Sequence, residues 1–413
     1  MKINLRVLTS RPHHNQWKEW IRESDVDNLT TECTICGSRL HTVSNLVNKR
    51  GHAVFSRAIC PICHFVTLSR APNESWLSDY YNRRWDGERK YLAEQHDKTS
   101  NPVPLEYLKK VEGNCSRKEQ KILDVGAGYG TCVRSFLENG YTNIVAVEPS
   151  ERRSSHIKNT FGINAEHCRL EDYSSTNSYR KFDKFDYIYL WHVFEHLVDV
   201  KTKLQLFYDL LETDGYIMIA VPNFHRESFV GLAQSPVHQH SFSANNLYRL
   251  VEDSGFRIKI LDQHFDSVGL ILVAQKTIHE NHSCPAPPEF TQQEVTQKII
   301  RDLDLDSGYT PWKANEPFLL RLFDLRPTNA RIIKTQFPRL RYFVNRIGLE
   351  RFYLNHMRLP HFSMMVGFEK YSPELRDYIY DQVCVKQTPK EHRNSLPTVN
   401  LIYDNDCVPI WLK

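Results

Sequence analysis

The sequence has no apolar run long enough for a membrane helix. Its most apolar stretch, residues 268–274, has the length of a strand, whereas a membrane-spanning helix needs about 18 consecutive apolar residues. Residues 1–17 also lack the apolar core that a signal peptide carries. We therefore expect a cytoplasmic protein without membrane segments.

The chain also carries little net charge of either sign. Its 53 Lys and Arg residues nearly balance its 49 Asp and Glu residues, which gives a formal net charge of +4 over 413 residues. So small an excess does not by itself indicate a nucleic-acid partner. Apolar residues make up 41% and charged residues 25% of the chain, as in ordinary globular proteins, and the length suffices for two or three domains.

Cysteine, in contrast, occurs in two closely spaced pairs. Cys33 and Cys36 form one C-x-x-C pair, and Cys60 and Cys63 form the other. Two such turns can place four thiolates around Zn²⁺, with each sulfur about 2.3 Å from the metal. Four thiolates leave no position for a water ligand, so we expect a structural zinc site. His64 after the second pair also fits the C-x-x-C-H signature of haem attachment, but haem of that kind belongs to exported proteins. Unrelated thiols or disulfides are the remaining alternatives.

Strand-like and helix-like segments alternate between residues 121 and 276. The expected strands cover residues 121–125, 143–147, 163–168, 184–191, 215–221, 256–261 and 268–275, and the expected helices cover 131–139, 150–160, 201–211 and 244–254. Such alternation predicts an α/β fold with a Rossmann-like, mostly parallel sheet of seven strands. The last two strands join through residues 264–267, which are too few for a crossover helix, so these strands are expected to pair antiparallel.

A glycine-rich turn follows the first of these strands, where Asp124 leads into Gly126, Gly128 and Gly130. Glycine permits unusual turn dihedrals and lets the backbone approach a ligand closely. The turn differs from the dinucleotide fingerprint at its last glycine, which favours an adenosine ligand without a diphosphate. Glu148 ends the next strand, where an acid can hold the ribose hydroxyls.

These motifs resemble those of class I S-adenosylmethionine-dependent methyltransferases over residues 120–275. The matching stretches are DVGAGYG, AVEPS, LEDY, FDYIYLWHVFEHLVD and LLETDGYIMIAVPN. The resemblance implies S-adenosylmethionine as cofactor. It also implies the cofactor-binding residues Asp124, Gly126, Ala127, Gly128, Gly130, Glu148, Pro149, Glu171, Asp172 and Trp191.

The order of the expected parts is similar to that of bacterial sugar C-methyltransferases. We expect a helical lead-in and zinc-binding module at residues 1–75, a methyltransferase domain at 76–276 and a C-terminal accessory domain at 289–413. In that family an HEH..FS segment carries the proposed base. Here the segment keeps His240, but Gln239 replaces its glutamate. The resemblance implies a sugar-like or nucleotide-linked acceptor.

Four residues are candidates for catalysis: His192, Glu195, His196 and His240. Methyl transfer to a hydroxyl or a carbon needs alignment and a base, and a base should titrate near the working pH, which favours histidine. Two alternatives stay open for the first three residues. The Glu-His pair can cap its turn structurally, and His192, Glu195 and His196 can bind a divalent metal, as in some quinone-ring O-methyltransferases.

The C-terminal region contains nine Lys or Arg residues against two acids between residues 325 and 370, interleaved with aromatic residues. Such a mixture suits RNA or a nucleotide-linked sugar, although an amphipathic helical region gives the same pattern. The expected function is therefore methylation of a small acceptor. An RNA methyltransferase and a catalytically idle cofactor-binding scaffold remain alternatives, and the sequence does not indicate the oligomeric state.

Overall fold

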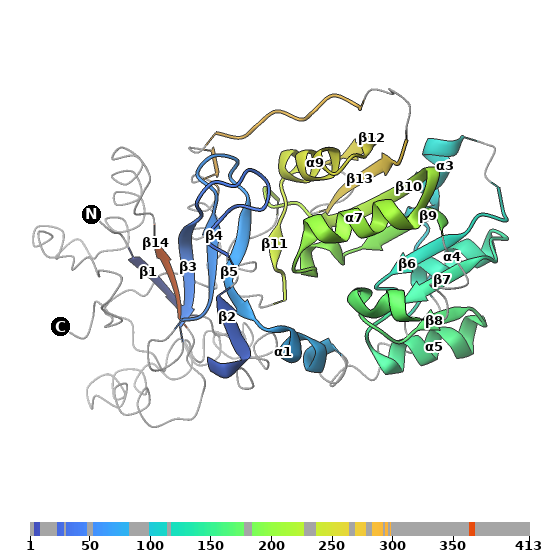
Figure 1. The fold of residues 1–413 in the computed structure, drawn as a ribbon, viewed down its shortest axis with the longest axis horizontal. Coiled ribbons are helices and arrows are strands. Elements are labelled where there is room, and N and C mark those ends of the chain that lie inside the picture. Colours follow the sequence, from blue (N-terminus) through green and yellow to red (C-terminus); the bar gives the residue numbers. More distant parts are fainter. Residues whose placement is uncertain are drawn as a thin grey trace, which may run out of the picture.

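The computed structural model contains two β-sheets that lie side by side (Figure 1). It describes residues 4–8, 23–28, 30–47, 53–81, 99–113, 117–176, 184–226, 237–263, 269–277, 283–291, 294–295, 298 and 363–367. Most of the expected accessory domain, including the basic segment at 325–370 apart from one strand, lies outside these residues. Among the described helices, none combines the length and apolar character needed to cross a bilayer.

The larger unit is built on a mixed sheet in the order β12-β13-β10-β9-β6-β7-β8. Its strands are β6 (Ile122–Val125), β7 (Ile144–Val147), β8 (Asn164–Glu166), β9 (Phe185–Trp191), β10 (Leu211–Pro222), β12 (Arg257–Asp262) and β13 (Gly269–Gln275). Strands β6 to β10 pair in parallel, whereas β13 pairs antiparallel with both β10 and β12. The predicted seven-stranded sheet with an antiparallel end is confirmed.

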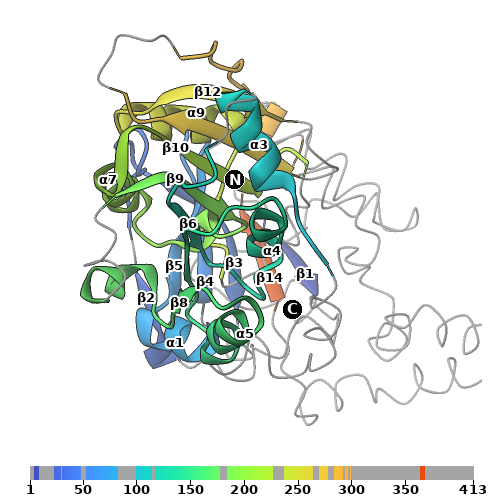
Figure 2. The same ribbon diagram turned by 90° about the vertical axis from the view of Figure 1, so that its right-hand side faces the viewer.

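Helices cover both faces of this sheet because successive strand residues point to opposite sides. Thus Ile122 packs in one hydrophobic cluster and its neighbour Leu123 in another. Figure 2 shows α7 on one side of β6 and β9, and α3 and α4 on the other. The helices are α3 (Val103–Glu112), α4 (Thr131–Glu138), α5 (Glu151–Phe161), α7 (Val200–Leu210) and α9 (Ala244–Asp253), with 3₁₀ turns η5 (Leu170–Ser175) and η6 (Phe194–His196).

The second sheet is antiparallel and draws strands from distant parts of the chain. Its strands are β1 (Asn4–Leu8), β2 (Val26–Asn28), β3 (His41–Val47), β4 (Ala53–Ile59), β5 (Val66–Pro72), β11 (His240–Ser241) and β14 (Ser363–Gly367). Strand β11 comes from the chain between β10 and α9, and β14 pairs with both β1 and β3. The 3₁₀ turn η3 (Glu23–Asp25) precedes β2, and helix α1 (Glu74–Asp79) leaves β5 toward the larger sheet (Figure 1).

The two sheets also share a hydrophobic core. Cys60 and Phe65, in the turn that joins β4 to β5, belong to the same buried cluster as Phe242 and Leu247, which lie beside and within α9. Phe65 packs against Phe242 with their ring centroids 5.5 Å apart. The cysteine-bearing sheet is therefore packed directly on the larger unit.

Candidate functional site

The glycine-rich turn connects β6 to α4 and adopts left-handed backbone conformations. Gly126 has a φ of 72°, and Gly130, the N-cap of α4, has a φ of 77°. A Cβ atom at Gly126 would lie 2.4 Å from Cγ2 of Val193. Any side chain at this position would therefore force Val193 to move, which explains the glycine in physical terms.

Glu148 directly follows β7 and contacts this turn. Its side chain is 4% exposed. The Gly128 amide donates to Oε2 at 2.8 Å, and the Ser150 amide donates to Oε1 at 2.9 Å. Each carboxylate oxygen has more than one acceptor position, so the two backbone bonds orient the group while leaving it able to accept hydroxyl protons from a ligand.

Asp124, at the end of β6, is a second buried acid beside the turn. It is 2% exposed, and among the described residues its Oδ2 atom accepts no hydrogen bond. Burial raises the pKa of Asp124 to about 7, against the opposing influence of Tyr189, and the nearby Glu148 carboxylate adds to the rise. A buried acid without a full set of partners suits a cationic ligand group.

A pocket opens where the glycine turn, the end of β7 and the turn after β9 meet. It is lined by Glu74, Leu77, Tyr81, Val125, Gly126, Val147, Glu148, Pro149, Arg153, Arg169, Leu170, His192, Val193, His196, Leu197 and Val198. The wall contributed by α1 and Tyr81 was not predicted, although the aromatic stretch at residues 76–81 is its sequence signal. Of the predicted site residues, Asp124, Ala127, Gly128, Gly130, Asp172, Trp191, Glu195 and His240 do not line this pocket.

Two of these predicted cofactor-binding residues have other neighbours. Asp172, on η5, is exposed and lies 3.8 Å from Nε of Arg169. The Trp191 ring packs edge-on against His192, with their centroids 5.2 Å apart. Glu171 lies on the same 3₁₀ turn as Asp172. The loop that contains them reaches the pocket through Arg169 and Leu170.

The turn after β9 brings His192, Glu195 and His196 together. His192 has a left-handed φ of 54° and donates its amide to the Ala220 carbonyl. Its Nδ1 lies 3.5 Å from Oε1 of Glu195, and Nε2 of His196 lies 3.8 Å from the same oxygen. The Glu195 side chain is 2% exposed, whereas that of His192 is 37% exposed. The acid therefore sits behind both rings, and His192 faces the pocket.

Burial alone would raise the pKa of Glu195, but neighbouring histidines outweigh it. The hydrogen bond from His192 and the nearby rings of His196 and His238 hold the pKa of this carboxyl below its usual range. Glu195 is therefore ionised at neutral pH. An ionised acid orients the ring of His192 and stabilises the imidazolium that forms when the ring accepts a proton.

His196 has a fixed orientation and a histidine neighbour that the sequence did not reveal. Its Nδ1 lies 2.9 Å from the Val237 carbonyl, which can only accept, so Nδ1 carries a proton. The Tyr81 hydroxyl lies 3.2 Å from the same nitrogen. The His238 ring packs edge-on at 4.7 Å. Ligand atoms of Glu195, His196 and His238 lie within 4.8 Å of one another, a grouping that contains His238 where the predicted metal set contained His192.

His240 lies behind the pocket wall in β11. It is 5% exposed, its Nε2 donates to the Val198 carbonyl at 3.1 Å, and its Nδ1 lies 2.9 Å from the Thr67 hydroxyl. Burial lowers the pKa of His240 to about 4, although the bond to Val198 opposes the shift. Both ring nitrogens are engaged in structural contacts, which makes His240 a weaker candidate for the base than His192.

The four cysteines of the two pairs converge at one end of the antiparallel sheet. Sγ of Cys33 lies 3.5 Å from that of Cys63, and Sγ of Cys36 lies 3.4 Å from Cys60 and 3.7 Å from Cys63. A tetrahedron with Zn–S distances of about 2.3 Å has edges of about 3.8 Å. The amides of Ile62 and Cys63 also donate to Sγ of Cys60. The cluster therefore fits a tetrahedral metal.

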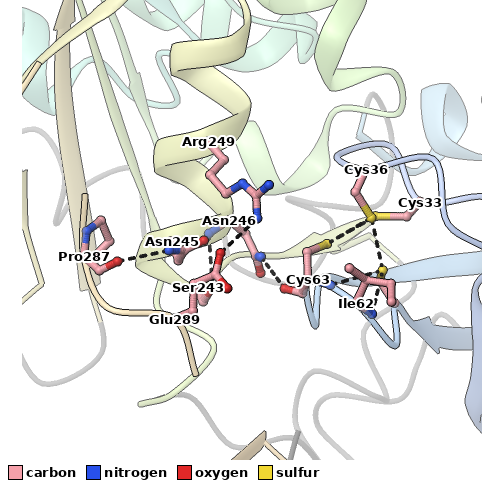
Figure 3. Close-up of polar contacts among 11 residues, drawn as sticks. Cys33, Cys36, Ile62, Cys63, Ser243, Asn245, Asn246, Arg249, Pro287 and Glu289 are labelled. Carbon is pink, nitrogen blue, oxygen red and sulfur yellow. Dashed lines mark hydrogen bonds and ion pairs between the residues drawn. The ribbon is translucent and has the colours of Figure 1, made fainter. Parts of the chain in front are cut away.

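The two cysteine turns have the same backbone geometry. Gly37 after the first has a φ of 74°, and His64 after the second has a φ of 58°. Their amides donate to the carbonyls of Cys33 and Cys60, respectively. Figure 3 shows the second turn beside α9, where the Asn246 side chain donates to the Cys63 carbonyl at 2.7 Å.

Comparison with known proteins places this site in context. Residues 74–259 match a family model described as a methyltransferase domain. The chain is 26% identical over 156 residues to the ubiquinone biosynthesis O-methyltransferase of Neisseria meningitidis serogroup C (strain 053442), covering 36% of this chain and 60% of that protein. It is 28% identical over 127 residues to the protein of the same name from Actinobacillus pleuropneumoniae serotype 5b (strain L20), covering 30% and 53%. The chain thus spans less than two thirds of the length of these relatives.

Two solved structures are similar to part of the chain. The 1,6-didemethyltoxoflavin-N1-methyltransferase of Burkholderia thailandensis, solved with bound 1,6-didemethyltoxoflavin and S-adenosylhomocysteine, is 19% identical. It covers 54% of this chain and 96% of its own length, with a TM-score of 0.35. An S-adenosylmethionine-dependent methyltransferase of Mesorhizobium loti covers 38% of this chain and 91% of its own length at 15% identity, with a TM-score of 0.33.

Proposed function

We propose a function from one premise: this chain carries a class I S-adenosylmethionine-dependent methyltransferase domain, as its motifs predicted. The proposed activity is methyl transfer from S-adenosylmethionine to a hydroxyl of a small-molecule acceptor. One observation carries it: the pocket that contains Gly126 and Glu148 also contains His192, which is backed by the ionised Glu195. The acid Glu148 and the base His192 thus face the same space, and Glu195 supports the base from behind.

The residues around the glycine turn fit the cofactor. Glu148 would hold the ribose hydroxyls, and Gly126 leaves the backbone accessible. Asp124, buried beside the turn and outside the pocket lining, would place a negative charge near a cationic group. When bound, S-adenosylmethionine supplies an electrophilic methyl group on a sulfonium. The protein's own task is to align the acceptor and to exclude water.

His192 is the proposed base. Its Nδ1 faces Glu195, which leaves Nε2 to accept the proton of an acceptor hydroxyl while the hydroxyl oxygen gains the methyl group. His196 is the proposed structural member of the turn, because its Nδ1 is bonded to Val237. His240 remains the second candidate for the base.

The acceptor is proposed as a small molecule with a weakly acidic hydroxyl. The curated relatives are named for O-methylation in ubiquinone biosynthesis, which favours a ring hydroxyl. The order of parts in the chain favours a sugar-like or nucleotide-linked hydroxyl instead. Methylation of a carbon atom or of RNA is an alternative that the turnover experiment below would detect.

For the cysteine cluster we propose structural Zn²⁺. Three features support it: four converging thiolates, two matching turns, and the two backbone amides that donate to Sγ of Cys60. We also keep the division at residues 1–75, 76–276 and 289–413 as a proposal, with the qualification that the sheet of the first part includes β11 and β14.

The test is turnover of radiolabelled S-adenosylmethionine by the purified full chain with catechols, sugar nucleotides and RNA in parallel. His192→Gln should lower the rate by about 100-fold or more, the usual contribution of a general base, and leave cofactor affinity within about threefold. His167→Gln, at an exposed position, is the matched control. A His192→Gln enzyme as fast as wild type would show that another group is the base.

A further inference from the structure

The segment at residues 237–242 contacts both the antiparallel sheet and the larger unit. It follows β10 along the chain, yet β11 within it pairs antiparallel with β5 of the cysteine-bearing sheet, with His240 opposite Thr67. The Leu68 amide donates to the Gln239 carbonyl at 2.8 Å. The segment is therefore fixed by the N-terminal sheet.

Arg57 on β4 forms polar contacts with the same segment. The residue is 1% exposed, its Nη2 donates to the His238 carbonyl at 2.8 Å, and its Nη1 lies 3.5 Å from the Ser241 hydroxyl. An arginine stays protonated in a protein. Burying its charge costs several kcal/mol unless hydrogen bonds offset the loss of water. Its contacts with this segment, at His238 and Ser241, lie on both sides of residues 239–240.

The opposite side of the segment touches the proposed active site. Val237 provides the carbonyl that accepts from His196, and the ring of His238 packs edge-on against His196. Nε2 of His240 donates to the carbonyl of Val198, which lines the pocket. The segment thus lies between Arg57 and the turn that carries Glu195.

We propose that Arg57 is a positioning residue of the methyltransferase site. By fixing the main chain at residue 238 and the side chain of Ser241, it places Val237 and His238 against His196, so that the cysteine-bearing sheet completes this wall of the pocket. The proposal rests on the proposed function for the identity of the site. The positions of the groups are independent of the acceptor.

The charge of Arg57 has a consistent second effect. Burial, together with the smaller effects of His196, Arg57 and His192, lowers the pKa of His238 to about 3, and only Glu195 opposes the shift. His238 is therefore neutral beside the ionised Glu195. A neutral ring can share a hydrogen bond or a ligand with its neighbours without repelling them.

The experiment compares the full-length wild type with Arg57→Met, Arg57→Lys and Phe55→Leu. Methionine removes both the charge and the hydrogen-bond donors, whereas lysine keeps the charge but donates from a single nitrogen. Phe55 is on the same strand and is 1% exposed, so its truncation weakens the sheet by loss of packing. Each variant is examined by hydrogen exchange of peptides covering residues 237–243, by the ¹⁵N spectrum of His238 assigned with His238→Gln, and by calorimetry with S-adenosylmethionine.

Arg57→Met should raise exchange at residues 237–243 by about tenfold or more, as expected for loss of a hydrogen bond from a charged donor. It should also shift the His238 resonances, and Arg57→Lys should restore part of both signals. Phe55→Leu should lower the melting temperature without either change.

The proposal is overturned if Arg57→Met shows the same hydrogen exchange and the same His238 resonances as the wild type. It is also overturned if Phe55→Leu shows the faster exchange and shifted resonances expected of Arg57→Met. If Arg57→Met does not fold, Arg57→Lys decides by the same two signals. Failure of the wild type to bind S-adenosylmethionine would contradict the proposed function alone, because exchange and resonance still report on Arg57.

Discussion

Replacing Asp124 by asparagine should stabilise the protein and weaken cofactor binding at the same time. The carboxyl lies buried at the end of β6, and burial raises its pKa from an ordinary 3.8 to about 7. At about 1.4 kcal/mol for each tenfold change in the equilibrium, the ionised carboxylate costs up to about 4 kcal/mol of folding free energy. Asparagine has nearly the same shape and cannot ionise.

The sign of the pH dependence follows from the raised pKa. Between about pH 4 and pH 7 the folded protein holds this proton more tightly than the unfolded chain does, so wild-type stability falls as the pH rises through this interval. The asparagine variant lacks that loss. Because its amide also needs buried partners, we expect a net gain of about 1–3 kcal/mol at pH 8 and a clearly smaller gain at pH 5.

The assay is urea unfolding of both proteins at pH 5 and pH 8, followed by calorimetry with S-adenosylmethionine. The cofactor is cationic at its sulfonium and amino groups, and a carboxylate is a better buried partner for a cation than an amide. We expect the variant to bind about tenfold more weakly. Asp253→Asn, at an exposed position at the end of α9, is the control. If the stability of wild type and Asp124→Asn depends on pH in the same way, the raised pKa of Asp124 is refuted. If the two proteins bind S-adenosylmethionine equally well, the role of Asp124 toward the cofactor is refuted.

Three further predictions concern the turn, the metal and the base. Gly126→Ala should destabilise the protein by about 1–3 kcal/mol more than Gly128→Ala. Both glycines have a positive φ, but only the new methyl group at residue 126 meets Val193. Equal losses of unfolding free energy in urea would contradict this prediction. Zinc analysis should find one ion per chain, and its removal by a chelator should lower the melting temperature in calorimetry; an unchanged transition would exclude a structural metal. Glu195→Gln should slow turnover by about tenfold or more with cofactor affinity kept, because it removes the negative charge beside His192; unchanged turnover would remove Glu195 from the mechanism.

The larger sheet was predictable because its signals are local. Each strand between residues 121 and 276 is an apolar run bounded by turn residues, and the short connection after β12 dictates an antiparallel end. Even the weak strand expected at 163–168 is present as β8. The boundaries shift by a few residues, most visibly in β10, which begins at Leu211.

The antiparallel sheet was less predictable because two of its strands come from far along the chain. The two residues of β11 are too few to show a periodic pattern, and β14 pairs across more than three hundred residues of sequence. Local propensity carries no information on such pairings. The cysteine spacing nevertheless indicated where the chain must converge.

The candidate site divides in the same way. His192, Glu195 and His196 lie within five residues, so one turn brings them together wherever the chain goes. The difference between His192 and His240 depends on long-range contacts, since His240 is bonded to Thr67 and Val198. No local pattern in the sequence reports such bonds.

The most direct test of the central claim is calorimetric titration of the full chain with S-adenosylmethionine, comparing wild type, Glu148→Gln and the control Glu151→Gln. Glutamine places an amide group where the Gly128 and Ser150 amides already donate, so the side chain loses its orientation and an acceptor. We predict saturable wild-type binding, weakened about tenfold or more by Glu148→Gln and unchanged by Glu151→Gln, at an exposed position. Equal affinity of wild type and Glu148→Gln, or no binding to wild type, would contradict the account.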